Sequence, residues 1–251
     1  MALSARSVKT SPCDISCKWE VAVLYKEQDV IIQTAKTLNN IGYMVITFDC
    51  RNSRGKSFNN RSCASMSSMY ADLWAVISWA KEQSFYTEPF LLGGHSLGGS
   101  VVLNYAEKYL QSVSNLILIS AIFDGNELYQ NTAKSAPEFM QQLQNAGVIR
   151  TQDGVDCFLD CTYLNDLQQY DLYKNVTNLA MPTLIITGDN DTASLPENNQ
   201  RFYKCLLCLK ELHVLGNCLH IYDTEENKKD LDEKIRTFLY SSNLHNKKYI
   251  I

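Results

Sequence analysis

The stretch Phe90-Leu91-Leu92-Gly93-Gly94-His95-Ser96-Leu97-Gly98-Gly99 decides the fold of this 251-residue chain. An apolar run enters a group of glycines, and the apolar spacing of a helix follows at residues 101–109. The five residues from Gly94 to Gly98 match G-x-S-x-G, the pattern of a serine on a sharp turn from strand into helix. Glycines two positions before and after the serine remove side chains that would collide in such a turn. The stretch therefore predicts that the Ser96 hydroxyl stands exposed at the start of a helix.

A serine in this position is a candidate nucleophile. The Leu97 amide would point toward a developing oxyanion, and the helix dipole favours negative charge at that point. The other interpretation is a glycine-rich turn that only joins a strand to a helix. A phosphate-binding loop is excluded, since neither G-x-G-x-x-G nor G-x-x-x-x-G-K-[ST] can be aligned here.

Strand and helix patterns alternate along most of the chain, which is typical of a parallel sheet covered by helices. Strands are expected at 21–25, 44–48, 90–92, 116–119, 183–187 and 212–215. Helices are expected at 31–39, 66–80, 101–109, 138–146 and 196–209, followed by a last helix that carries Leu231, Ile235, Phe238 and Leu239. The periodicity weakens between residues 123 and 179, which predicts an insertion packed over the end of the sheet.

Composition excludes several classes of protein. The net charge of −4 and the lack of a basic stripe argue against nucleic-acid binding. No apolar run approaches the roughly 18 residues of a membrane span, and no leader segment is visible. Nine cysteines, an odd number with scattered spacing, indicate free thiols in a reducing, cytoplasmic setting. Cys205 and Cys208 are interpreted as small apolar residues on one helix, so we expect no metal and no cofactor.

These motifs resemble those of the α/β-hydrolase superfamily, in particular small single-domain serine esterases, prolyl-peptidase-like hydrolases and monoacylglycerol-lipase-like hydrolases. The likeness covers about residues 19–240 and includes residues 42–51, which end in D-x-R, and residues 181–191, which resemble P-x-L-I-I-x-G-x-x-D. It implies one α/β-hydrolase domain over residues 1–251, with a mostly parallel central sheet, helices on both faces and a small cap at about residues 123–179.

The resemblance also implies an acid and a base for Ser96, in the chain order serine, acid, histidine. Asp191 matches the last residue of the acid motif, whereas Asp189 is expected to stabilise the turn. His220 lies in the loop after the last strand, although its G-x-x-x-H spacing is one residue longer than the family's common G-x-x-H. His213 falls inside that strand and is expected to be a wall residue. We therefore expect a triad of Ser96, Asp191 and His220.

The chain departs from the family at the end of its first strand, which lacks the usual His-Gly. That loop normally supplies the second oxyanion amide, and loss of one donor costs about 10²–10³ in rate. Two interpretations are open. An amide of Lys26 or Glu27 reaches the site together with that of Leu97, or the oxyanion hole is degraded and the protein is slow or inactive.

The resulting hypothesis is a cytoplasmic serine hydrolase that cleaves a carboxylic ester or thioester of a small molecule through an acyl-enzyme on Ser96. The alternative is a catalytically impaired α/β-hydrolase-fold protein that binds a ligand or a partner. Acyl transfer to another acceptor would use the same residues, and amide cleavage is disfavoured by the short oxyanion loop. Two roles are open for a set of large apolar side chains in the expected cap, the lining of an acyl pocket or the cap's own core: Tyr129, Phe139, Met140, Leu143, Phe158 and Tyr163.

Overall fold

The computed structural model describes residues 6–7, 18–23, 28–51, 65–146, 149–150, 156–157 and 161–247. Its strands are β1 (Arg6–Ser7), β2 (Lys18–Val23), β3 (Tyr43–Phe48), β4 (Phe90–His95), β5 (Val113–Ile119), β6 (Ile149–Arg150), β7 (Asp156–Cys157), β8 (Thr183–Gly188) and β9 (Lys210–Leu215). Its helices are α1 (Asp29–Asn40), α2 (Met66–Lys81), α3 (Leu97–Lys108), α4 (Gly125–Ser135), α5 (Pro137–Ala146), α6 (Cys161–Leu167), α7 (Pro196–Cys205) and α8 (Glu225–Lys247), with a 3₁₀ turn, η1, at Val176–Asn178.

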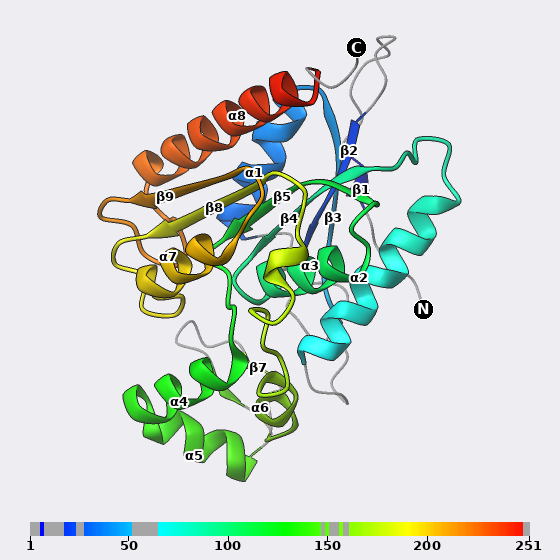
Figure 1. The fold of residues 1–251 in the computed structure, drawn as a ribbon. Coiled ribbons are helices and arrows are strands. Elements are labelled where there is room, and N and C mark those ends of the chain that lie inside the picture. Colours follow the sequence, from blue (N-terminus) through cyan, green and yellow to red (C-terminus); the bar gives the residue numbers. More distant parts are fainter. Residues whose placement is uncertain are drawn as a thin grey trace.

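The main sheet has the strand order β1-β3-β2-β4-β5-β8-β9 (Figure 1). Every neighbouring pair is parallel except β1 with β3, where Arg6 lies opposite Thr47 in antiparallel register. The prediction of a mostly parallel sheet is therefore confirmed. Strands β4 and β5 lie in the middle, so the turn that follows β4 opens at the centre of the sheet's carboxyl edge.

Each face of the sheet carries its own apolar core, because successive side chains of a strand point to opposite faces. In β5, Leu116 and Leu118 join the cluster under α2, α3 and α7, while Ile117 and Ile119 join the cluster under α1 and α8. All four side chains are almost fully buried. The continuous apolar run of this strand is thus explained by burial on both faces.

Helices cover both faces, as predicted. Helices α1 and α8 contact each other on one face, and α2 contacts α3 on the other (Figure 1). Within the described parts of the chain, we find no helix with the length and apolar character needed to cross a lipid bilayer.

An insert between β5 and β8, residues 125–170, contains α4, α5 and α6 and stands apart from the sheet in Figure 1. Its two ends are joined by backbone hydrogen bonds, from the Gly125 amide to the Tyr170 carbonyl at 2.8 Å and from the Leu172 amide to the Phe123 carbonyl at 2.8 Å. The insert therefore leaves and re-enters the main domain at one point beside the sheet.

Helix α7 is shorter than the predicted helix at 196–209. It ends at Cys205, because Leu206 has extended backbone angles of φ −65° and ψ 140°. The prediction that Cys205 and Cys208 share a helix is therefore wrong: Cys208 lies in the loop before β9. The expected strand end at Leu24 and Tyr25 lies outside the described residues.

The join between β4 and α3 depends on the absence of a side chain at residue 94. A Cβ atom at Gly94 would lie 2.3 Å from the Gly98 carbonyl oxygen, and a Cβ atom at Gly99 would lie 2.6 Å from the Ala121 side chain. Both contacts are far inside van der Waals distance. Helix α3 can therefore pack this closely on β4 and β5 only with glycine at both positions.

We predict that Gly94→Ala lowers the free energy of unfolding by about 1–3 kcal/mol or more, because the added methyl group meets rigid backbone. Gly216→Ala is the matched control, since a Cβ atom there has no neighbour within 4 Å. It should change stability by less than about 0.5 kcal/mol. Urea denaturation of both variants measures the difference, and equal stability of the two would contradict the packing described.

Candidate active site

Ser96 occupies the turn between β4 and α3 with φ 56° and ψ −127°, a conformation rare for a residue with a side chain. Such backbone costs of order 1–3 kcal/mol and persists where the surroundings enforce it. Here the Ser96 amide donates to the Ile119 carbonyl at 2.9 Å. The Ser96 side chain is half-buried. Because Leu97 is the first residue of α3, the Leu97 amide has no acceptor within the helix.

Asp191 lies in the loop after β8 and is buried, with 2% of its surface exposed. Its carboxylate accepts the Ala193 amide at 2.9 Å and the Ser194 amide at 2.7 Å. The Ser194 hydroxyl in turn donates to the Ala121 carbonyl at 2.8 Å and accepts from the Asn199 side chain at 2.9 Å. The loop is therefore fixed to the end of β5 and to α7 while it holds the carboxylate.

His220 lies in the loop after β9, with its Nδ1 atom 3.0 and 2.9 Å from the two Asp191 carboxylate oxygens. Burial alone would raise the pKa of Asp191, but the hydrogen bond and charge of His220 outweigh it and lower the pKa. The carboxylate therefore stays ionised and orients the ring through Nδ1, which leaves Nε2 available to another partner.

The structure does not join Ser96 to this pair by a hydrogen bond. Within the described part of the chain, the Ser96 hydroxyl has no hydrogen-bond partner and makes no such bond to His220. Hydrogen bonds between catalytic groups are often long without substrate and tighten in the complex. The three expected residues thus follow β4, β8 and β9 at the same edge of the sheet, with β5 between β4 and β8. Only the acid and the histidine are in direct contact.

Two residues behind Asp191 were not predicted. The Ser120 hydroxyl lies 2.9 Å from the Tyr222 hydroxyl, and interaction with Ser120 contributes to the lowered pKa of Asp191. Ser120 and Tyr222 both have positive φ, 47° and 54°. Their only signal in the sequence is position, one residue past a predicted strand and two residues past His220.

The other candidates have structural contacts. Asp189 accepts the Cys218 amide at 3.1 Å and so ties the loop after β8 to the loop after β9. His213 lies on β9, where its ring contacts Glu211 at 3.2 Å. Lys26 and Glu27, the expected oxyanion donors besides Leu97, lie outside the described residues.

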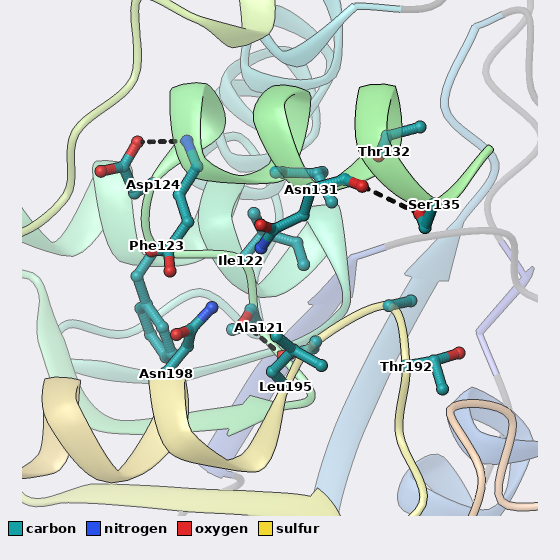
Figure 2. A pocket seen from close by; sticks show the side chains of 14 residues that line it. Ala121, Ile122, Phe123, Asp124, Asn131, Thr132, Ser135, Thr192, Leu195 and Asn198 are labelled. Carbon is teal, nitrogen blue, oxygen red and sulfur yellow. Dashed lines mark hydrogen bonds between the residues drawn. The ribbon is translucent and has the colours of Figure 1, made fainter. Parts of the chain in front are cut away.

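A cavity of about 140 Å³ adjoins the Asp191 loop and lies between that loop and α4 (Figure 2). Thr192 and Ala193, which directly follow Asp191, form part of its wall. From α4, polar side chains and one leucine line it: Glu127, Leu128, Asn131, Thr132 and Ser135. The cavity therefore has a mixed wall, with hydroxyl and amide groups beside apolar surface.

The large apolar residues expected in the cap do not line this cavity. Met140 packs with Tyr129, Phe139 and Tyr163 in a small cluster of the insert's own. The second of the two interpretations, a core for the cap itself, is therefore favoured for Tyr129, Phe139 and Met140, whereas Tyr163 also packs against the main core. The side chains of Leu143 and Phe158 lie outside the described residues.

The sequence of this chain matches a known protein family. The model of the family described as "Serine aminopeptidase, S33" matches residues 26–156, a little over half of the chain. The match contains the turn at Ser96 but ends before Asp191 and His220, so the acid and the histidine rest on the geometry above.

Individual relatives share the fold. Lysophosphatidylserine lipase ABHD12 of Danio rerio is 28% identical over 185 residues, 72% of this chain and 44% of the relative, so the chain spans less than half of that protein. The structure of Est1E from Butyrivibrio proteoclasticus with ferulic acid bound has a TM-score of 0.79 at 21% identity and covers 96% of both chains. Mouse alpha/beta hydrolase domain-containing protein 10 has a TM-score of 0.73 at 15% identity, covering 95% of this chain and 94% of its own. The chain thus has the α/β-hydrolase fold.

We predict that Ser194→Ala lowers the free energy of unfolding by about 1–3 kcal/mol, because the buried Ala121 carbonyl loses its donor and the Asn199 amide keeps only the Leu195 carbonyl as acceptor. Thr192→Ala, an exposed hydroxyl two residues earlier, is the control and should change it by less than about 0.5 kcal/mol. Urea denaturation distinguishes the two. A Ser194→Ala protein as stable as Thr192→Ala would mean that these hydrogen bonds do not hold the Asp191 loop.

Proposed function

The chain belongs to the "Serine aminopeptidase, S33" family of α/β-hydrolases, and from that premise we propose that it cleaves a carboxylic ester or thioester through an acyl-enzyme on Ser96. The contact between His220 and the buried Asp191 carboxylate carries this proposal. A buried carboxylate that fixes one ring nitrogen is what a general base needs to keep its tautomer and to bear a proton.

In the proposed mechanism the Ser96 hydroxyl attacks the substrate carbonyl carbon while its proton passes to His220 Nε2. The carbonyl oxygen becomes an oxyanion, held by the Leu97 amide and by one from Lys26 or Glu27. The tetrahedral intermediate then expels the alcohol or thiol, which takes the proton from His220, and leaves the acyl group on Ser96.

Water completes the cycle by attacking the acyl carbon as His220 removes its proton. Collapse of this second intermediate releases the carboxylic acid, and the proton returns from His220 to the Ser96 oxygen. Asp191 stays ionised throughout and stabilises the positively charged ring. No metal ion or cofactor takes part in this scheme.

We favour an ester over a peptide with a free amino terminus, in spite of the family's name. Recognition of such a peptide needs a carboxylate for its ammonium group. The two carboxylates of the cavity wall are committed within the protein, since Asp124 caps α4 through the Glu127 amide and Glu127 pairs with Arg201. An uncharged group is the better match for this wall, and we propose that the insert caps the site and binds part of the substrate there.

We also propose that the protein is cytoplasmic. The structure shows Cys50, Cys205, Cys208 and Cys218 as free thiols, and proteins of oxidising compartments usually pair their cysteines.

The test is reaction of the protein with a fluorophosphonate probe, together with hydrolysis of short-chain p-nitrophenyl esters. We expect the wild type to be labelled, and Ser96→Ala to lose both labelling and turnover, by about 10⁴-fold or more in kcat. Ser112→Ala, at the opposite edge of the sheet where β5 begins, is the control and should retain both.

A folded wild type that neither reacts with the probe nor hydrolyses esters would overturn the proposal. The alternative function, a ligand-binding protein of the same fold with a degraded oxyanion hole, would then be favoured. Labelling that persists in Ser96→Ala would instead show that the nucleophile is another residue.

A further inference from the structure

His95 connects two loops of the active site through one buried ring. It is the last residue of β4, directly before Ser96, and only 2% of its surface is exposed. Its Nε2 atom lies 2.8 Å from the His220 carbonyl oxygen, and its Nδ1 atom lies 3.3 Å from the Gln28 side-chain amide. Neither contact is local, because 125 and 67 residues separate the partners in sequence.

The chemistry of the two contacts defines the state of the ring. A carbonyl oxygen can only accept, so Nε2 must carry the hydrogen that it donates to His220. Burial, and then the nearby His220, lowers the pKa of His95 to about 3, so the ring is neutral and Nδ1 is an acceptor. The Gln28 amide must then present its NH₂ group to Nδ1, which is possible because the two ends of an amide have the same shape.

Both partners occupy sites that matter to the proposed reaction. His220 is the proposed base, and the hydrogen bond is made to its own backbone. Gln28 is the N-cap residue of α1. It comes directly after the pair Lys26-Glu27, which contains the proposed second oxyanion donor. A single ring beside the nucleophile is therefore bonded to the base loop and to the end of the oxyanion loop.

We infer that His95 is a positioning residue that fixes the His220 loop and the Gln28 loop relative to Ser96. This inference rests on the proposed function. Its effect is on geometry alone, since His95 exchanges no proton with the substrate.

A neutral aromatic ring meets the demands of this position. The His95 and His220 rings have their centroids 4.6 Å apart, and the Tyr222 ring meets His95 edge-on at 6.1 Å. Among the residues that the structure describes, the ionisable side chains around His95 are His220, Asp191 and Tyr222. A cationic donor such as lysine at residue 95 would repel the positively charged His220 that forms during the reaction, whereas neutral imidazole can donate without adding charge.

Two variants separate positioning from simple packing. His95→Phe keeps the ring and its volume but removes both hydrogen bonds, whereas His95→Gln places an amide NH₂ near the former Nε2 atom. We expect His95→Phe to lower kcat for a p-nitrophenyl ester by about 5- to 100-fold, because the partly buried His220 carbonyl loses its donor and the loop that carries the base is no longer fixed. KM should stay within about threefold, and His95→Gln should recover most of kcat.

Hydrogen exchange measures the same effect without relying on activity. In His95→Phe, amide exchange in residues 216–222 should be faster than in the wild type, and His95→Gln should restore slow exchange. Equal exchange in all three proteins would overturn the inference, as would a His95→Phe enzyme with unchanged kcat or one in which only KM rises. A wild type that does not react with a fluorophosphonate would contradict the proposed function. The hydrogen-exchange comparison would still show whether His95 fixes the His220 loop.

If His95→Phe does not fold, two variants of Gln28 test the same inference independently. Gln28→Met loses the hydrogen bond, whereas Gln28→Glu sets a carboxylate against the lone pair of Nδ1 or draws a proton onto His95 beside His220. Both effects oppose the reaction, so kcat should fall in the order wild type, Gln28→Met, Gln28→Glu. A Gln28→Glu protein as active as the wild type would overturn the inference.

Discussion

The strained turn at Ser96 is the constraint on which the rest of the site depends. Backbone with φ 56° and ψ −127° is unfavourable for a serine. It is held here by packing and by the hydrogen bond that the Ser96 amide donates to the Ile119 carbonyl. The packing is possible because Gly94 and Gly99 lie against backbone and Ala121 at distances that no Cβ atom tolerates. Strands β4 and β5 and helix α3 thus hold the turn rigidly and leave the Ser96 hydroxyl partly exposed.

Three loops at the carboxyl edge of the sheet are tied to this turn and to one another. The Asp189 carboxylate accepts a hydrogen bond from the Cys218 amide, and the Asn190 amide donates one to the Cys218 carbonyl. These two hydrogen bonds join the loop that carries Asp191 to the loop that carries His220. His95 adds a bond from β4 to the same histidine loop. Ser96, Ser120 and Tyr222, which follow β4, β5 and β9, all have positive φ angles. Backbone strain of this kind persists only where the surrounding structure enforces it.

The sequence predicted the parts of this site that local patterns encode. G-x-S-x-G predicted the turn at Ser96 because such a turn needs glycines at fixed offsets, whereas Asp191 was proposed because it matches the last residue of the family's acid motif. The contacts of His95, Ser120 and Tyr222 were missed, because they join residues 67 to 125 positions apart and only the folded sheet brings them together. Periodicity also could not decide whether Met140 and Tyr163 line a pocket or pack on each other, since both roles need an apolar face.

The central claim, that Ser96 is the nucleophile with His220 as its base, is tested most directly by a crystal structure of the protein after reaction with a fluorophosphonate. We expect phosphorus bonded to the Ser96 oxygen, with the phosphoryl oxygen at hydrogen-bond distance from the Leu97 amide. His220 Nε2 should lie within hydrogen-bond distance of the adduct while Nδ1 keeps its contact with Asp191. An adduct on another residue, or a His220 ring separated from the adduct, would contradict the account.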